Sequence, residues 1–255
     1  MVTVRHMEAT WVKNLLQWGM FIHTFSKTYY IHIIYINSMN ATIILTSTVN
    51  INEEKGVYQT DKLQRLETYL RSVKNWLQKT KFNIILVENS GYSFDELAEE
   101  KQKYKDRFEV VTFNEDELPY ANYLKGNNSK GACEIFAINY AFHNTTLRNK
   151  LGFIIKITAR FFINDLEKYL SQYDLNKFAC LTQFNRSRCE MVGSHIKNFW
   201  FIFNTHLVNK QNKYDGHIEN IWKERTSCFK NNLRCRRFEI EPTQRGGIAE
   251  IYSII

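Results

Sequence analysis

The chain has 255 residues, of which 44% are hydrophobic and 15% aromatic, enough to bury the core of one sizeable domain. This composition excludes an intrinsically disordered chain, and with 2 proline and 10 glycine residues it holds no long Pro- or Gly-rich linker. A mean hydropathy of −0.41 argues against a polytopic membrane protein. The five cysteines lack CxxC spacing, which indicates buried thiols in a reducing compartment, so we expect a cytoplasmic protein.

The net charge of +8 comes from one part of the chain. Residues 177–237 hold 12 Lys or Arg and 4 Asp or Glu, so this stretch carries the whole excess. It favours an anionic partner: a phosphate-bearing ligand, an anionic membrane surface touched peripherally, or nucleic acid. A nucleic-acid-binding module that uses 177–237 stays an alternative, although no docking motif is present and we do not expect a nucleic-acid partner. A solvated basic face is the other interpretation.

Residues 1–38 differ from the rest of the chain. The segment Trp11–Ile36 is rich in apolar and aromatic residues, but Lys13, Lys27 and two histidines interrupt it, which argues against a spanning helix. No small-residue cleavage site follows, so a signal peptide does not fit either. We predict that 1–38 is a leader, either membrane-associating or an upstream extension outside the core, and that 39–255 form a single domain.

From Met39 onward, apolar runs and amphipathic segments alternate. Strands are predicted at 41–45, 82–87, 108–113 and 152–163, and helices at 61–77, 93–104 and 131–142. For the second helix, Ser93 is the expected N-cap, with Glu96 completing a capping box. Strands that are apolar throughout are typical of a sheet covered on both faces. The sequence therefore predicts an α/β fold with a doubly wound, mainly parallel sheet and helices on both faces.

The second half of the domain has an α+β pattern. Helices are predicted at 165–173 and 214–225, strands at 178–182 and 237–240, and a strand or buried helix at 199–203. Ligands of parallel α/β sheets bind at the carboxyl ends of the strands. That rule selects the polar residues at 46–48, 88–91, 130–131 and 156–160 as candidate site residues.

Several common motifs are absent from the sequence. It contains no Walker A loop, GxGxxG, GxSxG, HExxH or paired CxxC motif, which weighs against ATPases and dinucleotide-dependent oxidoreductases. His195, His206 and His217 recur at intervals of eleven residues, which match no metal-ligand spacing.

Taken in order, the polar strand ends resemble those of GT-A-fold glycosyltransferases, particularly small ones of bacterial surface-glycan clusters and large DNA viruses. The resemblance covers about residues 41–165, including a helix that carries Arg65 and Tyr69. It implies transfer of a sugar from a nucleotide-diphosphate donor to a glycan or glycolipid acceptor, with a nucleotide-binding half at 39–165 and an acceptor half at 166–255. The residues it assigns to the nucleotide sugar are Thr46, Ser47, Thr48, Glu88, Asn89, Ser90, Lys130 and Gly131.

The sequence departs from this family where most members carry an Asp-x-Asp motif that holds a divalent metal. The segment from Lys156 to Phe161 stands there, without a carboxylate pair. Either Lys156 or Arg160 replaces the metal as a fixed cation on the diphosphate, or Mn²⁺ or Mg²⁺ is held by Asp165 or by the cluster at 115–117. Metal-independent operation thus stays open, and so does a noncatalytic nucleotide-sugar-binding homologue.

A transfer that inverts configuration needs a general base near the acceptor hydroxyl. Glu190 is the first candidate, because surrounding positive charge keeps a carboxylate ionised, and Asp215 is the second; surface carboxylates are the alternative for both. Arg245, in the Gly-rich turn 242–247, can fold over phosphates. The aromatic run 199–201 either stacks on a sugar or belongs to the core. A sugar-nucleotide pyrophosphorylase is a weaker alternative, because 46–51 lack its Gly-rich basic loop.

Overall fold

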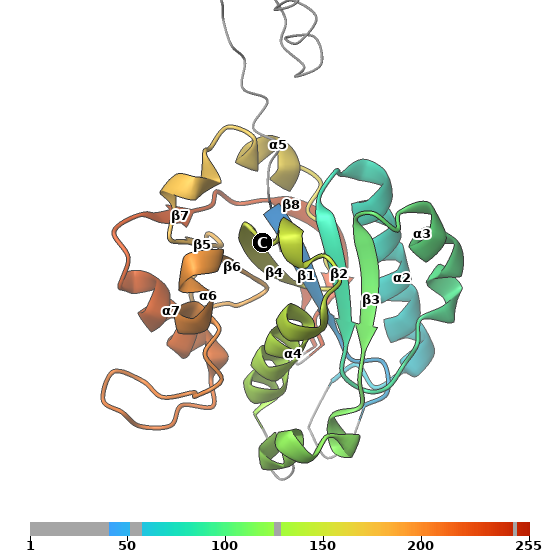
Figure 1. Ribbon diagram of the computed structural model, residues 1–255, viewed down its shortest axis with the longest axis horizontal. Helices are drawn as coiled ribbons and strands as arrows, with labels where there is room; N and C mark the ends of the chain where they lie inside the picture. The colour runs from blue at the N-terminus through green and yellow to red at the C-terminus, as the bar shows by residue number, and fades with distance from the viewer. Residues whose placement is uncertain (1–40, 52–57, 125–128, 247–248) are drawn as a thin grey trace, which may run out of the picture. The chain divides into compact units, whose positions relative to one another are not determined.

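A seven-stranded mixed sheet organises the chain, in the order β3-β2-β1-β4-β6-β5-β7 (Figure 1). The computed structural model describes residues 41–51, 58–124, 129–246 and 249–255, so the predicted leader lies outside the described residues. The strands are β1 (Ala41–Ser47), β2 (Asn83–Glu88), β3 (Phe108–Thr112), β4 (Phe153–Thr158), β5 (Cys180–Thr182), β6 (Met191–His195) and β7 (Asn232–Arg234).

Four strands form the parallel part that the sequence predicts. β1 lies between β2 and β4 and is parallel to both, and β3 is parallel to β2. α2 (Lys62–Lys79) covers one face and α4 (Lys130–Asn144) the other (Figure 1). β1 is apolar on both faces because both are buried: Ile43 and Leu45 face α2, and Ile44 faces α4. The predicted α/β fold with helices on both faces is confirmed.

The second part of the sheet is antiparallel where it joins the first. β6 lies between β4 and β5 and is antiparallel to both, whereas β7 is parallel to β5. The sequence pattern does not predict β6, because Gly193, Ser194 and His195 interrupt the apolar run of a buried strand. The helices of this part are α5 (Leu166–Leu170), α6 (Phe199–Ile202) and α7 (Ile218–Ser227). The aromatic run 199–203 is therefore helical.

The longest described helix is α2, with 18 residues and polar side chains on its outer face. No helix within the described ranges could span a lipid bilayer.

The predicted helix over 93–104 is wrong in its first turns. A 3-10 turn at Asp95–Leu97 precedes α3 (Ala98–Lys103), and neither has a side-chain cap. Phe94 has left-handed backbone with φ 52°, and Glu96 accepts a hydrogen bond from the Tyr92 hydroxyl instead of completing a capping box. The Phe94 ring is fully buried in the core on the α2 side, so its burial sets the local conformation.

Residues 239–254 form an antiparallel hairpin of β8 (Glu239–Gln244) and β9 (Ile251–Ile254). The expectation that the strand ends before Pro242 is wrong, since β8 continues through it. The register of the hairpin shifts between Glu239 and Thr243, and this irregularity accommodates a residue that cannot donate a ladder hydrogen bond. The tip of the hairpin becomes important at the site described below.

The packing of the antiparallel part can be measured at Gly193 in β6. A Cβ there would lie 2.9 Å from Phe153 Cε1 and 3.0 Å from Leu181 Cβ. We expect Gly193→Ala to lower the free energy of unfolding in urea by about 1–3 kcal/mol, the usual cost of overpacking a core. Gly216→Ala is the matched control, because its Cβ would meet no atom closer than 3.6 Å. Equal stability of the two variants would contradict the packing described.

Candidate functional site

The carboxyl ends of β1, β2 and β4 open into a cavity of about 930 Å³. The first turns of α2, the amino termini of α4 and α7 and the tip of the β8–β9 hairpin complete its walls. Its place follows the rule for α/β sheets, and its size suits a drug-sized ligand. The predicted site residues that line it are Thr46, Ser47, Thr48, Asn89, Ser90, Lys130, Gly131, Arg160, Glu190 and Arg245.

Two buried arginines, here called the arginine pair, meet in one wall of this cavity. Arg65 comes from α2 and is 4% exposed, and Arg160 follows β4 and is 8% exposed. Both guanidiniums reach the hydroxyl of Tyr69, Arg65 Nη2 at 2.9 Å and Arg160 Nη2 at 3.4 Å. Their remaining acceptors are also neutral oxygens: the carbonyls of Thr48, Gln59 and Gln244 and the side-chain amide of Gln59.

The arginine pair has no acidic partner in the described part of the chain. No Asp or Glu carboxylate there lies within ion-pair distance of either guanidinium. Burial lowers the pKa of Arg65 and the positive charge of Arg160 acts in the same direction, whereas Tyr69 and the more distant Glu88 carboxylate raise it. Buried charges in proteins are normally paired, because desolvation is costly. Two such guanidiniums beside a cavity make it a candidate site for an anion.

The hairpin tip is shaped around Arg160. A Cβ at Gly246 would lie 2.8 Å from Arg160 Cζ, so a side chain at this position would displace the guanidinium. The Gly246 carbonyl accepts a hydrogen bond from the Tyr58 amide at 3.0 Å, which ties the tip to the segment before α2. The hairpin thus holds Arg160 in the wall, and it brings Arg245 to the cavity as well.

Lys130 and Arg245 add positive charge around the same cavity. Lys130 is the first residue of α4, whose Ser129 cap accepts a hydrogen bond from the Ala132 amide. Burial lowers the pKa of Lys130, and the positive charges of Arg245 and Arg65 lower it further. The amino terminus of a helix also favours an anion. These cations therefore converge on the space in front of the arginine pair.

Two of the small residues in the wall have packing roles of their own. The Ser47 hydroxyl donates to the Val87 carbonyl at 2.9 Å and so joins β1 to β2. A Cβ at Gly131 would lie 2.6 Å from Ile218 Cβ, so glycine permits the starts of α4 and α7 to approach each other.

Lys156, in contrast, lies beneath the cavity rather than in its wall. It faces α4 and is fully buried, and its Nζ atom lies 2.7 Å from the Glu134 carboxylate and 2.7 Å from the Cys189 carbonyl. Glu134 also accepts a hydrogen bond from the Thr46 hydroxyl at 2.8 Å. Burial alone would lower the pKa of Lys156, but the Glu134 carboxylate outweighs it and the pKa is raised. Of the two cations predicted to meet a diphosphate, only Arg160 lines the cavity.

Glu190 lies in the wall, 4% exposed, immediately before β6. Its Oε2 atom accepts a hydrogen bond from Gln183 Nε2 at 2.9 Å and lies 3.4 Å from Arg188 Nε. Its Oε1 atom lies 3.9 Å from Arg245 Nε. The positive surroundings expected for this carboxylate are present, and its three neighbours fix its orientation.

Glu88 was predicted to face the ligand, and the structure places it below the surface of the cavity. The residue is fully buried, and its carboxylate accepts hydrogen bonds from the amides of Val49, Ser90 and Tyr92 at 2.8–2.9 Å. The pKa of Glu88 is raised, because the effect of burial exceeds the opposite effect of these hydrogen bonds. Glu88 therefore holds together the loops that follow β1 and β2, and Ser90 is one of the residues it positions.

The turn after β2 keeps a polar surface toward the cavity. The Asn89 side chain accepts from the Thr48 hydroxyl at 2.6 Å and donates to Glu115 at 2.9 Å. Asn114 and Asp116 lie in the same part of the wall. Amide and carboxylate groups of this kind suit the donor and acceptor edges of a heterocyclic base.

Asp215 is not in the cavity wall, although its neighbours are. Its carboxylate accepts hydrogen bonds from the His217 amide at 2.9 Å and from Asn220 Nδ2 at 3.1 Å. It therefore orders the turn that leads into α7, and residues 216–219 line the cavity in its place. The prediction that Asp215 faces the ligand is corrected accordingly.

Asp165, the predicted metal ligand, lies far from the cavity. It precedes α5 and forms an ion pair with Arg236 at 3.0 Å. Glu167 of α5 accepts a hydrogen bond from the Lys81 amide, just before β2 begins, so α5 lies at the amino-terminal end of the parallel strands (Figure 1). The cavity lies at their other end.

The aromatic run 199–201 is also remote from the cavity. Trp200 of α6 is 52% exposed, but its ring contacts Phe142 and His143, at the carboxyl end of α4. The cavity lies at the amino end of that helix. The run therefore does not serve as a sugar platform for this site.

The donor set around the cavity does not fit a divalent metal. Among the described residues, no three or more His, Cys, Asp and Glu side chains converge to hold one. Of the predicted acidic cluster, Glu115 and Asp116 line the cavity, but Glu115 accepts a hydrogen bond from Asn89. The position expected for an Asp-x-Asp motif carries Arg160. Mg²⁺ and Mn²⁺ need several oxygen ligands around one point.

Some wall residues were not predicted as site residues. Arg65 and Tyr69 are polar residues on the buried face of α2, four positions apart. This spacing could have identified them from the sequence, because an arginine is rarely buried without a specific interaction. Glu134, His217 and Glu219 also line the cavity. They come from helix starts whose meeting depends on the tertiary fold.

No protein-family model matches the chain, and no curated protein matches it by sequence. Solved structures do match. Among the solved structures that it resembles are sugar transferases. The glycosyltransferase GlyE of Streptococcus pneumoniae TIGR4 aligns over 77% of this chain at 8% identity and a TM-score of 0.43, and the chain spans 45% of GlyE.

Two further structures give similar values. A protein of Desulfovibrio desulfuricans G20, assigned as a nucleotide-diphospho-sugar transferase, aligns over 77% of this chain and 79% of its own at 13% identity and a TM-score of 0.43. The galactosyltransferase LgtC, solved with donor and acceptor sugar analogues, aligns over 76% of this chain and 73% of its own at 9% identity and a TM-score of 0.47. At identities of 8–13%, the likeness to these three structures is one of fold.

The structural role of Glu88 can be measured. We expect Glu88→Ala to lower the free energy of unfolding in urea by about 2–4 kcal/mol, because one buried and two partly buried amides lose their acceptor. Glu99→Ala, an exposed carboxylate of α3, is the matched control and should change stability by less than about 0.5 kcal/mol. If the Glu88 variant were as stable as this control, Glu88 would not be what holds the loops after β1 and β2 together.

Proposed function

We propose that the protein is a glycosyltransferase that binds a nucleoside-diphosphate sugar in this cavity and transfers the sugar to a carbohydrate acceptor. The observation that carries the proposal is the arginine pair, two buried guanidiniums that face a cavity at strand carboxyl ends without a carboxylate partner among the described residues. A diphosphate supplies the missing negative charge, and two of its oxygens can accept parallel hydrogen bonds from one planar guanidinium.

The rest of the wall supports a nucleotide sugar rather than a simple phosphate. The cavity has about 930 Å³, far more than a phosphate ion fills. The polar turn around Asn89 offers hydrogen bonds to a base on one side, and Glu190 lies on the opposite part of the wall, beside β6. A donor that extends from the turn past the arginine pair would bring its sugar toward Glu190.

Glu190 is the proposed general base. Gln183 and Arg188 hold one of its oxygens and leave Oε1 beside Arg245 at the cavity. In the transfer, the acceptor oxygen forms a bond to the anomeric carbon, the bond from that carbon to the phosphate oxygen breaks with its electron pair on the phosphate, and Glu190 takes the acceptor proton.

The carbohydrate nature of the acceptor is supported by the rim of the cavity. Tyr214 is 60% exposed, and its ring lies beside Gly216, one of the wall residues. An exposed aromatic ring offers a flat apolar face against which the C–H face of a sugar can pack. Glycans and glycolipid headgroups both present such faces.

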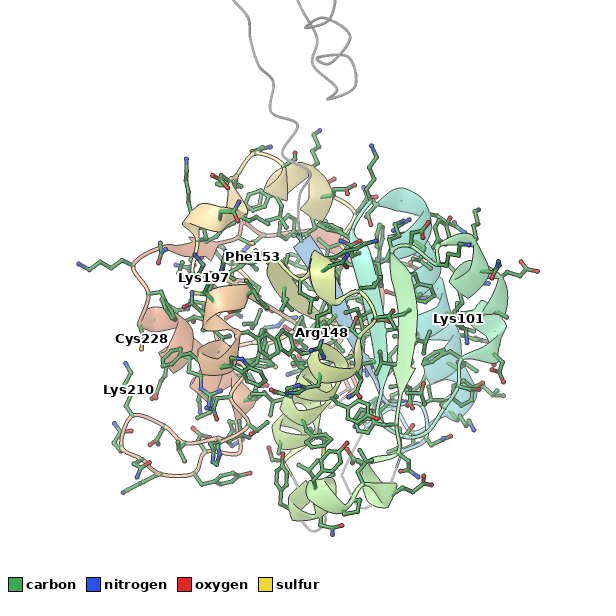
Figure 2. The ribbon with its side chains drawn as sticks, in the orientation of Figure 1. Lys101, Arg148, Phe153, Lys197, Lys210 and Cys228 are labelled. Atoms are coloured by element: carbon green, nitrogen blue, oxygen red, sulfur yellow. The ribbon has the colours of Figure 1, made fainter. Side chains whose placement is uncertain are left out.

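A nucleic-acid-binding module over 177–237 is less well supported. Arg186 and Arg225 donate to main-chain carbonyls, and Arg236 pairs with Asp165, so part of the positive charge stabilises the fold itself. Lys197 and Lys210 are exposed, but they lie on different segments, well apart in the view of Figure 2. A noncatalytic nucleotide-sugar binder shares the same cavity and is distinguished by turnover.

Calorimetry followed by a turnover assay tests the proposal. UDP and GDP are titrated into the full chain, and a panel of nucleotide sugars is then screened for donor hydrolysis and transfer. We expect one nucleotide to bind and its sugar conjugate to turn over. We expect Glu190→Gln to lower kcat about 100-fold while Kd changes less than about twofold, because a general base acts in the transition state.

The exposed Glu99→Gln variant controls for a loss of charge and should keep full kcat. Binding without turnover of any donor would favour the noncatalytic binder. No heat with any nucleotide would refute the proposal as a whole.

A further inference from the structure

We infer that the site neutralises the diphosphate with the arginine pair and operates without a divalent metal. This inference rests on the proposed function, since it concerns how the same cavity holds the same donor. It is carried by the position of Arg160, the bonding of the nearby carboxylates and the charge that an incoming metal would meet.

Arg160 occupies the place where a metal would be held. It follows Thr158, the last residue of β4, by two positions and turns its side chain into the cavity wall. The guanidinium is held by Gln59 and Gln244, and Gly246 leaves the space it needs. A cation is thus held at the end of β4 by two other segments of the chain, the one before α2 and the hairpin tip.

Four of the five carboxylates that line the cavity have partners in the wall. Glu134 lies 2.7 Å from Lys156 Nζ, and Glu190 is held by Gln183 and Arg188. The remaining ones are dispersed: Glu219 lies 3.9 Å from Arg245, and Glu115 accepts from Asn89. No three metal-binding side chains converge within the described ranges. A metal would have to break these contacts to gain ligands.

Electrostatics also disfavours a metal in front of the arginine pair. Arg65 and Arg160 are both buried, and the pKa of Lys130 already falls through burial and the charges of Arg245 and Arg65. A divalent cation there would be repelled by several fixed charges, and repulsion is strong where water is excluded. The same charges attract a diphosphate and stabilise the negative charge that grows on it as the sugar departs.

The two guanidiniums are fixed to different segments of the chain. Arg65 donates to Thr48 and Gln59, which fixes it to the loop after β1, whereas Arg160 is fixed to the hairpin. The Tyr69 hydroxyl bridges them. The pair therefore forms one rigid anion-binding unit whose geometry is set before the donor arrives, so little ordering is needed on binding.

Nucleotide titration with and without metal tests the inference on the full chain. UDP and GDP are titrated by calorimetry in buffer with EDTA and again with Mn²⁺ or Mg²⁺. We expect Kd to change less than about twofold between these conditions. Arg160→Gln and Arg65→Gln should each weaken Kd at least about tenfold in EDTA, the usual effect of losing a charge-assisted contact.

Matched variants keep the result interpretable. Arg71→Gln removes an exposed arginine of α2 that pairs with Glu241 outside the cavity, and it should leave Kd unchanged. Arg160→Lys retains the charge without the fork and should bind more weakly than the native chain. Circular dichroism identifies any variant that fails to fold, and in that case the comparison of EDTA with Mn²⁺ in the native chain decides.

The outcomes separate the two proposals. Binding that needs Mn²⁺ or Mg²⁺ would leave the proposed function intact and overturn the metal-free site. Equal binding by the folded Arg160→Gln variant would also overturn it. No binding of either nucleotide under any condition would refute the proposed function and this inference together.

Discussion

Arg65 and Arg160 meet at the hydroxyl of Tyr69, almost fully buried and held only by neutral oxygen atoms in the described part of the chain. An arrangement of this kind is unfavourable for the folded protein on its own, because two like charges are desolvated next to each other. It persists because packing holds it in place: α2 supplies Arg65 and Tyr69, β4 leads into Arg160, and the hairpin tip packs against Arg160. The rest of the site is arranged around this charge.

The fold brings the necessary pieces to one edge of the sheet. β1 and β4 are adjacent and parallel, so their carboxyl ends deliver Thr46–Thr48 and Thr158–Arg160 to the same place. The antiparallel β6 adds Glu190 from the opposite direction. Buried polar groups below the cavity hold its walls in place. They are the Lys156–Glu134 ion pair and the Glu88 carboxylate with the amides it binds. The cavity thus has a supporting layer as well as a lining.

The sequence is most informative where burial leaves a continuous pattern. The apolar runs of β1, β2 and β4 predict a sheet covered on both faces, and the strand-end rule finds Thr46, Asn89 and Arg160. It fails where residues are chosen by tertiary contacts. The carboxylate of Glu88 and the ammonium of Lys156 look exposed to a ligand in sequence, but strand alternation and neighbouring amides bury them. The sequence does not predict β6, because pairing with β4 and β5, rather than its own composition, makes this segment a strand.

Thermal unfolding in the presence of inorganic pyrophosphate tests the central claim most directly. If the arginine pair binds an anion, pyrophosphate should raise the Tm above that in sodium chloride of equal ionic strength. The rise should increase with the logarithm of the pyrophosphate concentration once this exceeds Kd, as mass action requires. In Arg65→Gln the gain should shrink to a small fraction of the native one. Identical Tm values in the two salts, or an equal gain in the variant, would contradict the account.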